Sequence, residues 1–297
     1  MVKVENISKA FKKVQAVNNV SFHAEKGELF GIIGPDGAGK TTLFRIMTTL
    51  TIPDNGTVFI NNRSIFNDYM EIRKNIGYMP GKFALYQDLT VEENLNFFAS
   101  VFNTTIEENY HLIKGIYSHI APFKDRKAGK LSGGMKQKLA LSCALIHKPE
   151  VLFLDEPTTG VDPVSRKEFW DMLYELKNMG ITIIVSTPYM DEASRCDRIA
   201  LIKNGAFIDV DTPKNIINNF DKTLISLKAD NMRLLLKDVR KCRQIQSAFA
   251  FGAEIHAIVD NSKSIEHVNI HLQNLNHKNI EIYKIAPNIE DCYIWSR

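Results

Sequence analysis

Long hydrophobic runs are missing from this sequence of 297 residues. No apolar stretch approaches the roughly 18 residues that a membrane-spanning helix needs. The densest runs, such as 151–154 and 181–185, have the length of strands. The first residues also lack the apolar segment of a signal peptide. We therefore expect a chain that neither spans a membrane nor carries a secretion signal.

Cysteine is scarce as well. The four cysteines, Cys143, Cys196, Cys242 and Cys292, lie far apart and form no CxxC pair. This pattern predicts reduced thiols in the cytosol rather than a disulfide framework or a zinc site. The histidines from His111 onward show no spacing typical of metal ligands, so we expect them to be ordinary surface or core residues.

Charge of one sign is not in excess. The chain has 37 Lys+Arg and 34 Asp+Glu, a formal net charge of +3, and no block of basic residues. Nucleic acid is therefore not an expected partner. Apolar residues, at 44%, are abundant enough for a core. At about 150 residues per domain, the length allows about two domains.

Strand-length apolar runs alternate with helical patterns through residues 1–220. This alternation predicts an α/β domain with a largely parallel sheet. The stretch at about 81–148 has no convincing strand and is interpreted as a helical insertion. The expected strands are 27–33, 75–79, 151–155, 181–186 and 198–202, and the expected helices are 40–49, 91–102, 133–147 and 163–178.

The sequence changes character after about residue 220. Short strands are predicted at 224–229, 254–259 and 280–285, and helices at 232–244 and 265–275. Residues 221–297 are therefore expected to form a small α+β domain after the first domain.

A glycine-rich segment carries the strongest chemical signal. Residues 34–41 match the phosphate-binding pattern GxxxxGK[ST], with a strand before them and a helix after them. Glycines let backbone N–H groups turn inward around a phosphate, and the helix N-terminus favours an anion. Lys40 would bind the β- and γ-phosphates, and Thr41 would be a Mg²⁺ ligand. The predicted nucleotide-binding residues here are Gly34, Pro35, Asp36, Gly37, Ala38, Gly39, Lys40, Thr41 and Thr42.

Two acids end the apolar run 151–156. A carboxylate at the end of a buried strand can lie beside a phosphate loop. Asp155 would then hold Mg²⁺, and Glu156 would be the general base that polarises the attacking water. Many core strands end in an acid, so the phosphate loop 115 residues before Asp155 gives this pair its significance.

Ser132, Gly133 and Gly134 open a predicted helix. Exposed backbone N–H groups at a helix start can bind a second anion, although such a segment is also found at plain helix starts. One chain with a phosphate loop and a separate anion site suggests that two chains share each nucleotide.

Together these segments resemble the nucleotide-binding subunits of ABC transporters over residues 1 to about 220. The phosphate loop, the Leu-Ser-Gly-Gly-Met-Lys-Gln segment 131–137 and Leu-Phe-Leu-Asp-Glu-Pro-Thr-Thr-Gly at 152–160 occur in the family's order and spacing. The resemblance implies a P-loop NTPase cassette with a parallel core sheet, an antiparallel N-terminal subdomain and a helical insertion. It also implies ATP and Mg²⁺ as ligands, and ATP hydrolysis.

The same resemblance implies partners. Ser132–Gly134 of one chain would face the γ-phosphate held by a second cassette, in a homodimer or a heterodimer. Residues 158–162 resemble the loop that links the two sites, and Phe11 occupies the position of an aromatic that stacks on adenine, although it could equally be a core residue. A transmembrane permease would meet the surface near residues 81–95, which places the chain at the cytoplasmic face of the cell membrane.

Two positions depart from the family pattern. The family usually has Gln where this chain has Gly81, and His where this chain has Pro188. Neither residue offers a side-chain hydrogen bond to the γ-phosphate or Mg²⁺. The departures predict slow hydrolysis or, alternatively, a nucleotide-gated clamp that hydrolyses little. A heterodimer whose other cassette supplies the Gln and His would be consistent with them too.

The tail refines the resemblance. Residues 287–293 and 189–193 are similar to single-cassette exporters of the multidrug and antibiotic-resistance type. In that subgroup the tail looks like a regulatory or dimer-supporting element, and a simple packing cap is the alternative. A soluble ABC protein that acts on ribosomes or DNA is disfavoured, because the chain has one cassette and no long coiled coil.

Overall fold

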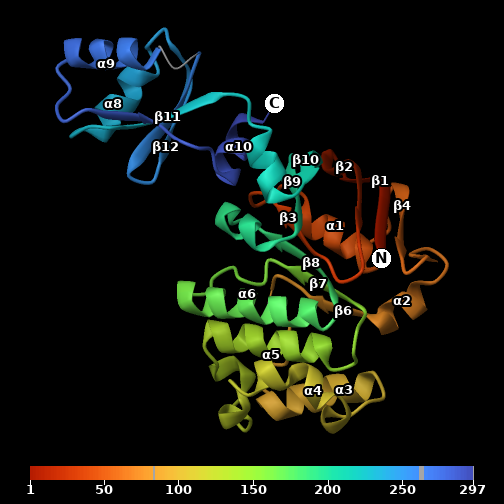
Figure 1. Cartoon of the computed structure of the whole chain (residues 1–297). Coiled ribbons are helices and arrows are strands. Elements are labelled where there is room, and N and C mark those ends of the chain that lie inside the picture. The colour runs from red at the N-terminus through yellow and green to blue at the C-terminus, as the bar shows by residue number, and fades with distance from the viewer. Residues whose placement is uncertain (83, 261–263, 297) are drawn as a thin grey trace. The chain divides into compact units, whose positions relative to one another are not determined.

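The computed structural model describes residues 1–82, 84–260 and 264–296. The chain divides into two compact units, Met1–Pro213 and Lys214–Ser296, each with its own hydrophobic core (Figure 1). The boundary expected from the sequence, after residue 220, lies a few residues beyond this division. The two units are described separately below.

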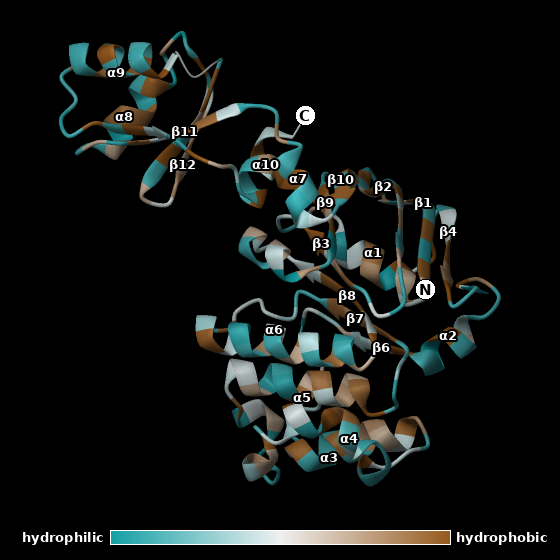
Figure 2. Cartoon of the chain, in the orientation of Figure 1, coloured by the Kyte–Doolittle hydropathy of each residue, from teal (hydrophilic) through white to brown (hydrophobic). Residues whose placement is uncertain are grey.

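A six-stranded sheet forms the centre of the first unit. Its order is β10-β9-β3-β8-β7-β6, in which all neighbours are parallel except the edge pair β10 and β9. All residues of β3, β7 and β8 are buried, which explains their largely apolar sequences. The strands are β3 (Leu29–Ile33), β6 (Ile76–Met79), β7 (Val151–Asp155), β8 (Thr182–Thr187), β9 (Arg198–Lys203) and β10 (Ala206–Asp211). The predicted parallel core is confirmed, and Figure 2 shows its central strands as mostly hydrophobic.

Helices pack on this sheet and follow the strands that carry the site. In α1 (Lys40–Met47) the ring of Phe44 packs edge-on against Phe153 of β7, with 6.3 Å between centroids. Asp162 caps the N-terminus of α6 (Pro163–Asn178), because its carboxylate accepts the N–H groups of Val164 and Ser165. A 3₁₀ segment, η3 (Met190–Arg195), follows β8.

A second, antiparallel sheet completes the first part of the unit. Its order is β2-β1-β4-β5, as the predicted antiparallel N-terminal subdomain requires. The strands are β1 (Val2–Phe11), β2 (Val14–Ala24), β4 (Asn55–Ile60) and β5 (Arg63–Ser64), and α2 (Tyr69–Asn75) follows them.

The described residues between β6 and β7 form helices and no strand, as predicted for the insertion. Thr90 and Thr105 each start a helix with a capping box, in which a Glu three residues later bonds back to the threonine N–H. The helices are α3 (Val91–Val101), α4 (Ile106–Tyr117), α5 (Gly133–Leu145) and the 3₁₀ turns Ala121–Phe123 and Ala128–Lys130.

The second unit contains a split β-α-β arrangement. Its sheet order β12-β13-β11-β14 is wholly antiparallel and, with two crossover helices, gives the β-α-β-β-α-β pattern of ferredoxin-like folds. The elements are α7 (Pro213–Asn218), β11 (Thr223–Lys228), α8 (Met232–Val239), β12 (Ile245–Phe251), β13 (Glu254–Val259), α9 (Ser264–Asn274), β14 (Glu281–Lys284) and α10 (Ile289–Trp295). The prediction of a helix to residue 244 was wrong, because α8 ends at Val239; β12 and α10 were not predicted.

Helix α10 lies against the sheet face that α8 and α9 leave open. Leu235, Val239, Val268 and Leu272 of α8 and α9 share a core with Ala257 of β13 and alternate strand residues. On the opposite face, His256 Nδ1 lies 2.7 Å from Asp291 Oδ1 of α10, and the indole N–H of Trp295 donates to Ser247 Oγ over 2.5 Å. Helix α10 therefore contacts the second face of this sheet at β12 and β13. Among the described residues of either unit, no helix has the length and apolarity needed to cross a bilayer.

Candidate nucleotide-binding site

The loop between β3 and α1 has the close packing that its glycines permit. Gly39, the residue before α1, has φ 106°, and a Cβ there would lie 2.2 Å from the Ala16 carbonyl oxygen. A Cβ on Gly34 would lie 2.4 Å from the Ile202 carbonyl oxygen. Side chains at either position would clash with backbone, so glycine is required at both.

Lys40 is held inside the loop. Its side chain is 2% exposed, and its ammonium donates to the carbonyl oxygens of Gly34 (2.7 Å) and Pro35 (2.9 Å). The same ammonium lies 3.0 Å from Glu156 Oε1. The predicted phosphate-binding cation and the predicted general base therefore form an ion pair.

Ser186 of β8 holds both predicted acids. Its hydroxyl donates to Asp155 Oδ1 (2.7 Å) and accepts the N–H of Glu156 (2.9 Å), which also donates to the Ser186 carbonyl (3.1 Å). The Glu156 backbone has φ 51°, a left-handed conformation that costs a non-glycine residue on the order of 1–3 kcal/mol. Strain of this kind concentrates at functional sites.

Asp155 is 1% exposed, and the Thr41 hydroxyl hydrogen-bonds to its carboxyl group. Burial raises the pKa of Asp155, and the hydrogen bonds from Ser186 and Thr41 oppose this shift. Two oxygen ligands on neighbouring side chains fit Mg²⁺, which usually takes one or two protein ligands and completes its shell with phosphates and water. The structure thus brings together the two residues predicted to hold the metal.

A cavity of about 340 Å³ opens over the loop. It contains most of the predicted catalytic and loop residues, together with Gln15 and Asn204, which sequence reasoning missed. The Asn-Gly turn at 204–205 was a usable signal, because Gly205 N–H donates to the Ala38 carbonyl and so braces the loop. The residues that line it are Val14, Gln15, Ala16, Gly37, Gly39, Lys40, Thr41, Thr42, Glu156 and Asn204.

Phe11 is not among the residues that line this cavity. Its ring is 50% exposed, and the Lys9 ammonium lies 5.6 Å from the ring centroid. An exposed ring excludes the alternative that Phe11 is a core residue, while its stacking on adenine stays a prediction.

Ser132–Gly134 lie apart from the cavity lining and pack against a different loop. Ser132 caps α5 by accepting the Met135 N–H over 3.3 Å. A Cβ on Gly133 would lie 3.6 Å from the Gly160 carbonyl oxygen, and one on Gly134 would lie 2.7 Å from Ser165 Oγ. Within one chain, this segment therefore packs against the 158–162 loop and the start of α6, while its role toward a second chain stays a prediction.

Gly81 and Pro188, the two positions that differ from the family pattern, lie beside the acids and the phosphate loop. A Cβ on Gly81 would lie 3.1 Å from the Asp155 carbonyl oxygen and 3.8 Å from Asp155 Oδ2. Pro188 follows Thr187, whose carbonyl accepts the N–H of Gly34 over 3.2 Å. Both positions are next to the phosphate loop or its acids, and neither supplies a hydrogen-bonding side chain.

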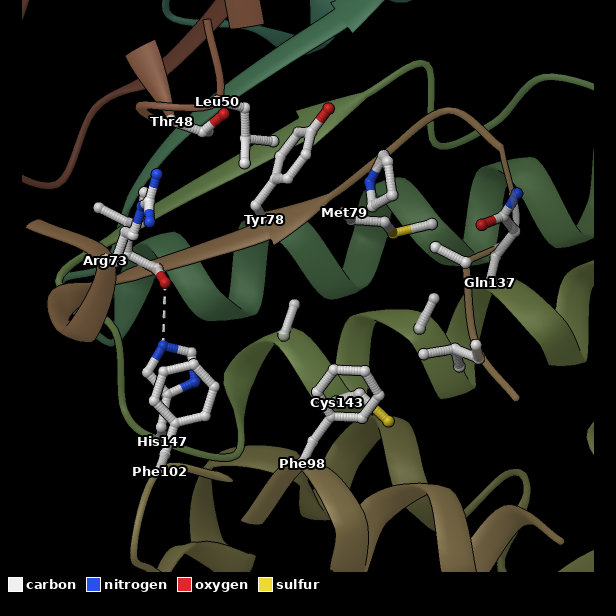
Figure 3. Close-up of a pocket in the computed structure, with 16 residues that line it drawn as sticks. Thr48, Leu50, Arg73, Tyr78, Met79, Phe98, Phe102, Gln137, Cys143 and His147 are labelled. Carbon is white, nitrogen blue, oxygen red and sulfur yellow. Dashed lines mark hydrogen bonds between the residues drawn. The ribbon is translucent and has the colours of Figure 1, made fainter. Parts of the chain in front are cut away.

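A second cavity, of about 260 Å³, lies between β6 and the helical insertion (Figure 3). Figure 3 shows Phe98 and Phe102 pointing toward it from the helices, with Tyr78 and Met79 on the strand side. His147 stacks on Phe102 with 3.7 Å between centroids and bonds to the Ile76 carbonyl over 2.9 Å, and burial lowers its pKa. The cavity is mostly apolar and separate from the phosphate loop.

The sheet, the glycine loop and the two acids define a P-loop nucleotide-binding protein. The comparisons with known proteins narrow this class. The family model described as "ABC transporter" matches residues 17–159. The Nod factor export ATP-binding protein I of Burkholderia lata is 36% identical over 253 residues, which are 84% of this chain and 81% of that protein. The chain therefore belongs to the ABC transporter ATP-binding family, and the resemblance found in the sequence is confirmed.

Further relatives and solved structures of this family are similar to the chain. The probable multidrug ABC transporter ATP-binding protein YbhF of Escherichia coli is 36% identical over 95% of this chain. The chain spans only about half of that relative, 49% of its length. Among solved structures, cbiO1 of Clostridium perfringens has a TM-score of 0.65 at 28% identity, over 73% of this chain and 90% of that one. The cassette MJ0796, a dimer bound to ADP and Pi, has the same TM-score and identity, over 71% and 98%.

Proposed function

We propose that this chain hydrolyses Mg-ATP and thereby powers a separate membrane-spanning exporter. The observation that carries the proposal is the meeting of Lys40 and Glu156, 3.0 Å apart, beside the buried Asp155 and under one cavity. A cation for the phosphates, a base for water and a metal-binding carboxylate are the parts that phosphoryl transfer to water needs.

The ion pair suggests how the site is activated. An incoming γ-phosphate offers Lys40 an alternative anionic partner, so that Glu156 is released from the ammonium. The free carboxylate can then accept a proton from water as the water oxygen bonds to the γ-phosphorus. The bond from that phosphorus to the bridging oxygen breaks, and ADP leaves with the electron pair.

Thr41 and Asp155 are the residues that would hold Mg²⁺. The hydroxyl and the carboxylate are hard oxygen donors, and within 1–82, 84–260 and 264–296 no cluster of three or more metal-ligating side chains competes with them. When bound, Mg²⁺ offsets the negative charge of the β- and γ-phosphates. Asp155 and Thr41 would keep the positive charge of the ion close to that of Lys40.

The test is the turnover of ATP by the purified chain, with Glu156→Gln as the control and EDTA to remove Mg²⁺. We expect slow hydrolysis that EDTA and the substitution both abolish. Because one missing preorganised donor costs about 10²–10³-fold in rate, Gly81 and Pro188 favour a slow enzyme. Equal activity of the wild type and Glu156→Gln would contradict hydrolysis by this site.

A nucleotide-gated clamp is the second candidate, and the same two positions favour it. A clamp would bind ATP and dimerise without measurable turnover, whereas Glu156 opposes this function. ATP-dependent dimerisation by light scattering, measured beside turnover, separates the two candidates. Whether the second cassette is a copy of this chain or another chain follows from mass spectrometry of the dimer isolated from cells.

The cavity between β6 and the helical insertion is our proposed contact for the permease. Ala84 and Leu85 line it, and they belong to the 81–95 segment that resembles the permease contact of the family, of which residue 83 lies outside the described residues. Leu50, 52% exposed, lines it too. An apolar, aromatic lining suits the end of an apolar helix. A pull-down of the tagged chain from solubilised membranes should recover a multi-span protein in near-stoichiometric amount. Recovery in the soluble fraction alone would contradict the proposed place at the cytoplasmic face of the membrane.

A further inference from the structure

Glu192 is a buried carboxylate outside the predicted site. It lies in η3 and is 3% exposed. One oxygen, Oε2, accepts hydrogen bonds from the Thr158 hydroxyl (3.1 Å) and the Thr187 hydroxyl (2.5 Å). Both threonines are themselves buried. Because a buried carboxylate is costly unless it is bonded, this arrangement requires all three side chains to stay in place.

The other oxygen of Glu192 has a counter-charge but no hydrogen bond. Oε1 is buried, and the Nε of Arg166 lies 3.6 Å from it. Arg166 is held in turn by Asp191, at 3.1 Å, and by stacking on Tyr189 at 4.5 Å from the ring centroid. The cation that balances Glu192 is therefore fixed by α6 and η3 and does not replace the two threonine bonds.

The two threonines belong to segments with different roles. Thr187 ends β8, and its carbonyl accepts the N–H of Gly34 at the start of the phosphate loop. Thr158 follows Glu156 by two residues and begins the 158–162 loop, in which Gly160 packs against Gly133. Glu192 thus joins the end of β8 to the loop that lies between the base and the Ser132–Gly134 segment.

The identity of residue 188 makes this link more important. Pro188 stands at the end of β8 without a side-chain donor, and Ser186 is already engaged with Asp155 and Glu156. Thr187, through Glu192, therefore supplies a further side-chain bond from this strand end to the 158–162 loop.

We propose that Glu192 is a positioning residue for hydrolysis, which fixes the 158–162 loop to the end of β8. It thereby keeps Glu156 at the phosphate loop and Gly133 at the surface that faces a second chain. This inference rests on the proposed ATPase function. The charge of Glu192 balances Arg166, but the positioning comes from the hydrogen bonds that Thr158 and Thr187 donate. An amide oxygen can accept these two bonds as well.

The experiment compares Glu192→Ala and Glu192→Gln with a matched control, Glu28→Ala. Glu28 is also buried, at 8% exposure, and pairs with Arg198 at 3.4 Å, but it lies at the start of β3, at the other end of the sheet. We expect Glu192→Ala to lower kcat about tenfold or more with KM within about twofold. Glu192→Gln should recover most of the rate, and Glu28→Ala should lose stability without this effect on kcat.

A second measurement does not depend on turnover. In the nucleotide-free full chain, hydrogen–deuterium exchange at residues 158–162 should be faster by about tenfold in Glu192→Ala, but not in Glu28→Ala. Unchanged exchange in that loop, or a rate loss in Glu28→Ala as large as in Glu192→Ala, would overturn the proposal. If the wild type does not hydrolyse ATP, the proposed function fails, while the exchange result still decides the position of Glu192.

Discussion

The Lys40 ammonium lies 3.0 Å from Glu156 Oε1, and the two residues belong to segments that follow different strands of the central sheet. Lys40 opens α1 after β3, whereas Glu156 follows β7 directly, and β8 separates the two strands in the sheet. The carboxylate thus occupies the lysine that a phosphate would need. We therefore expect nucleotide binding to break this pair.

The pair predicts tighter ATP binding when its carboxylate is neutralised. In Glu156→Gln, Lys40 has no anionic partner to lose, so we expect the Kd for ATP to fall by roughly tenfold, about 1.4 kcal/mol. The measurement is calorimetric titration in EDTA, at protein concentrations that keep the chain monomeric. Glu28→Gln serves as the control; an equal Kd for Glu156→Gln and the wild type would show that the pair does not compete.

We predict a gain of activity when the residues of the family pattern are restored at positions 81 and 188. Restoring the family residue in Pro188→His should raise kcat, by up to about 10²-fold if the imidazole reaches the γ-phosphate. Gly81→Gln should gain less, because its Cβ would lie 3.1 Å from the Asp155 carbonyl oxygen and the backbone must shift slightly. Steady-state turnover is the readout, and each gain must vanish when Glu156→Gln is added. No gain in either variant would show that other groups limit the rate.

Asp155 predicts a conflict between stability and activity. Because burial raises its pKa in the folded chain, the ionised form costs stability at neutral pH. This cost begins to shrink as the pH falls through the raised pKa and is gone only below the pKa of the unfolded chain. Asp155→Asn removes the charge and should raise the Tm by about 2–4 °C, which is roughly 1 kcal/mol for a unit of this size. The same variant should lose Mg²⁺-dependent turnover. Calorimetry and the turnover assay test both parts, and a lower Tm would contradict the first.

The permease contact predicts a selective loss of assembly. Leu50→Glu places a charge in the apolar cavity, at a side chain already 52% exposed, so the fold should persist. We expect the multi-span partner to be lost from the pull-down while the turnover of the isolated chain stays unchanged. Met179→Glu, at another exposed apolar residue outside that cavity, should retain the partner. Loss of the partner in both variants would point to a general effect of charge.

The second unit predicts a stability defect that can be observed alone. Asp291 is fully buried, caps α10 with Asn288 and bonds to His256. Asp291→Ala removes the half of the capping box in which the carboxylate accepts the Asn288 N–H, and it leaves His256 without its carboxylate partner, at a cost of about 2 kcal/mol. In a Trp170→Phe background Trp295 is the remaining tryptophan, so its fluorescence during urea unfolding follows this unit. An unchanged midpoint would show that α10 is held by its apolar contacts alone.

Much of the first unit could be predicted because its signals are local. The buried parallel strands have continuous apolar runs, and the phosphate loop is defined by spacing within residues 34–41. The acids could be placed because Asp155 and Glu156 end such a strand. The strand β10 was missed, since its six residues are only partly buried and alternate weakly.

The features that were missed depend on contacts distant in the sequence. Nothing near Glu192 signals that its carboxylate will meet Thr158, 34 residues earlier. The Asn-Gly turn at 204–205 signals a turn, but not that Asn204 will line the cavity over the phosphate-binding loop. In the second unit, β12 was not predicted because Ser247 interrupts its apolar pattern, yet that serine faces Trp295 of α10. Pairings of this kind need the tertiary structure.

The hydroxyl of Ser186 has a single proton, and its two bonds determine where that proton lies. Because the oxygen accepts the N–H of Glu156, the proton is committed to Asp155 Oδ1. An oxygen that already accepts a hydroxyl proton is the less favourable one to protonate, so the bond favours Oδ2 as the oxygen of Asp155 that takes up a proton. Oδ2 is also the carboxyl oxygen nearest the position where a Cβ on Gly81 would stand. One small side chain, which lies outside the cavity lining, thus biases which face of the carboxylate exchanges protons with its surroundings.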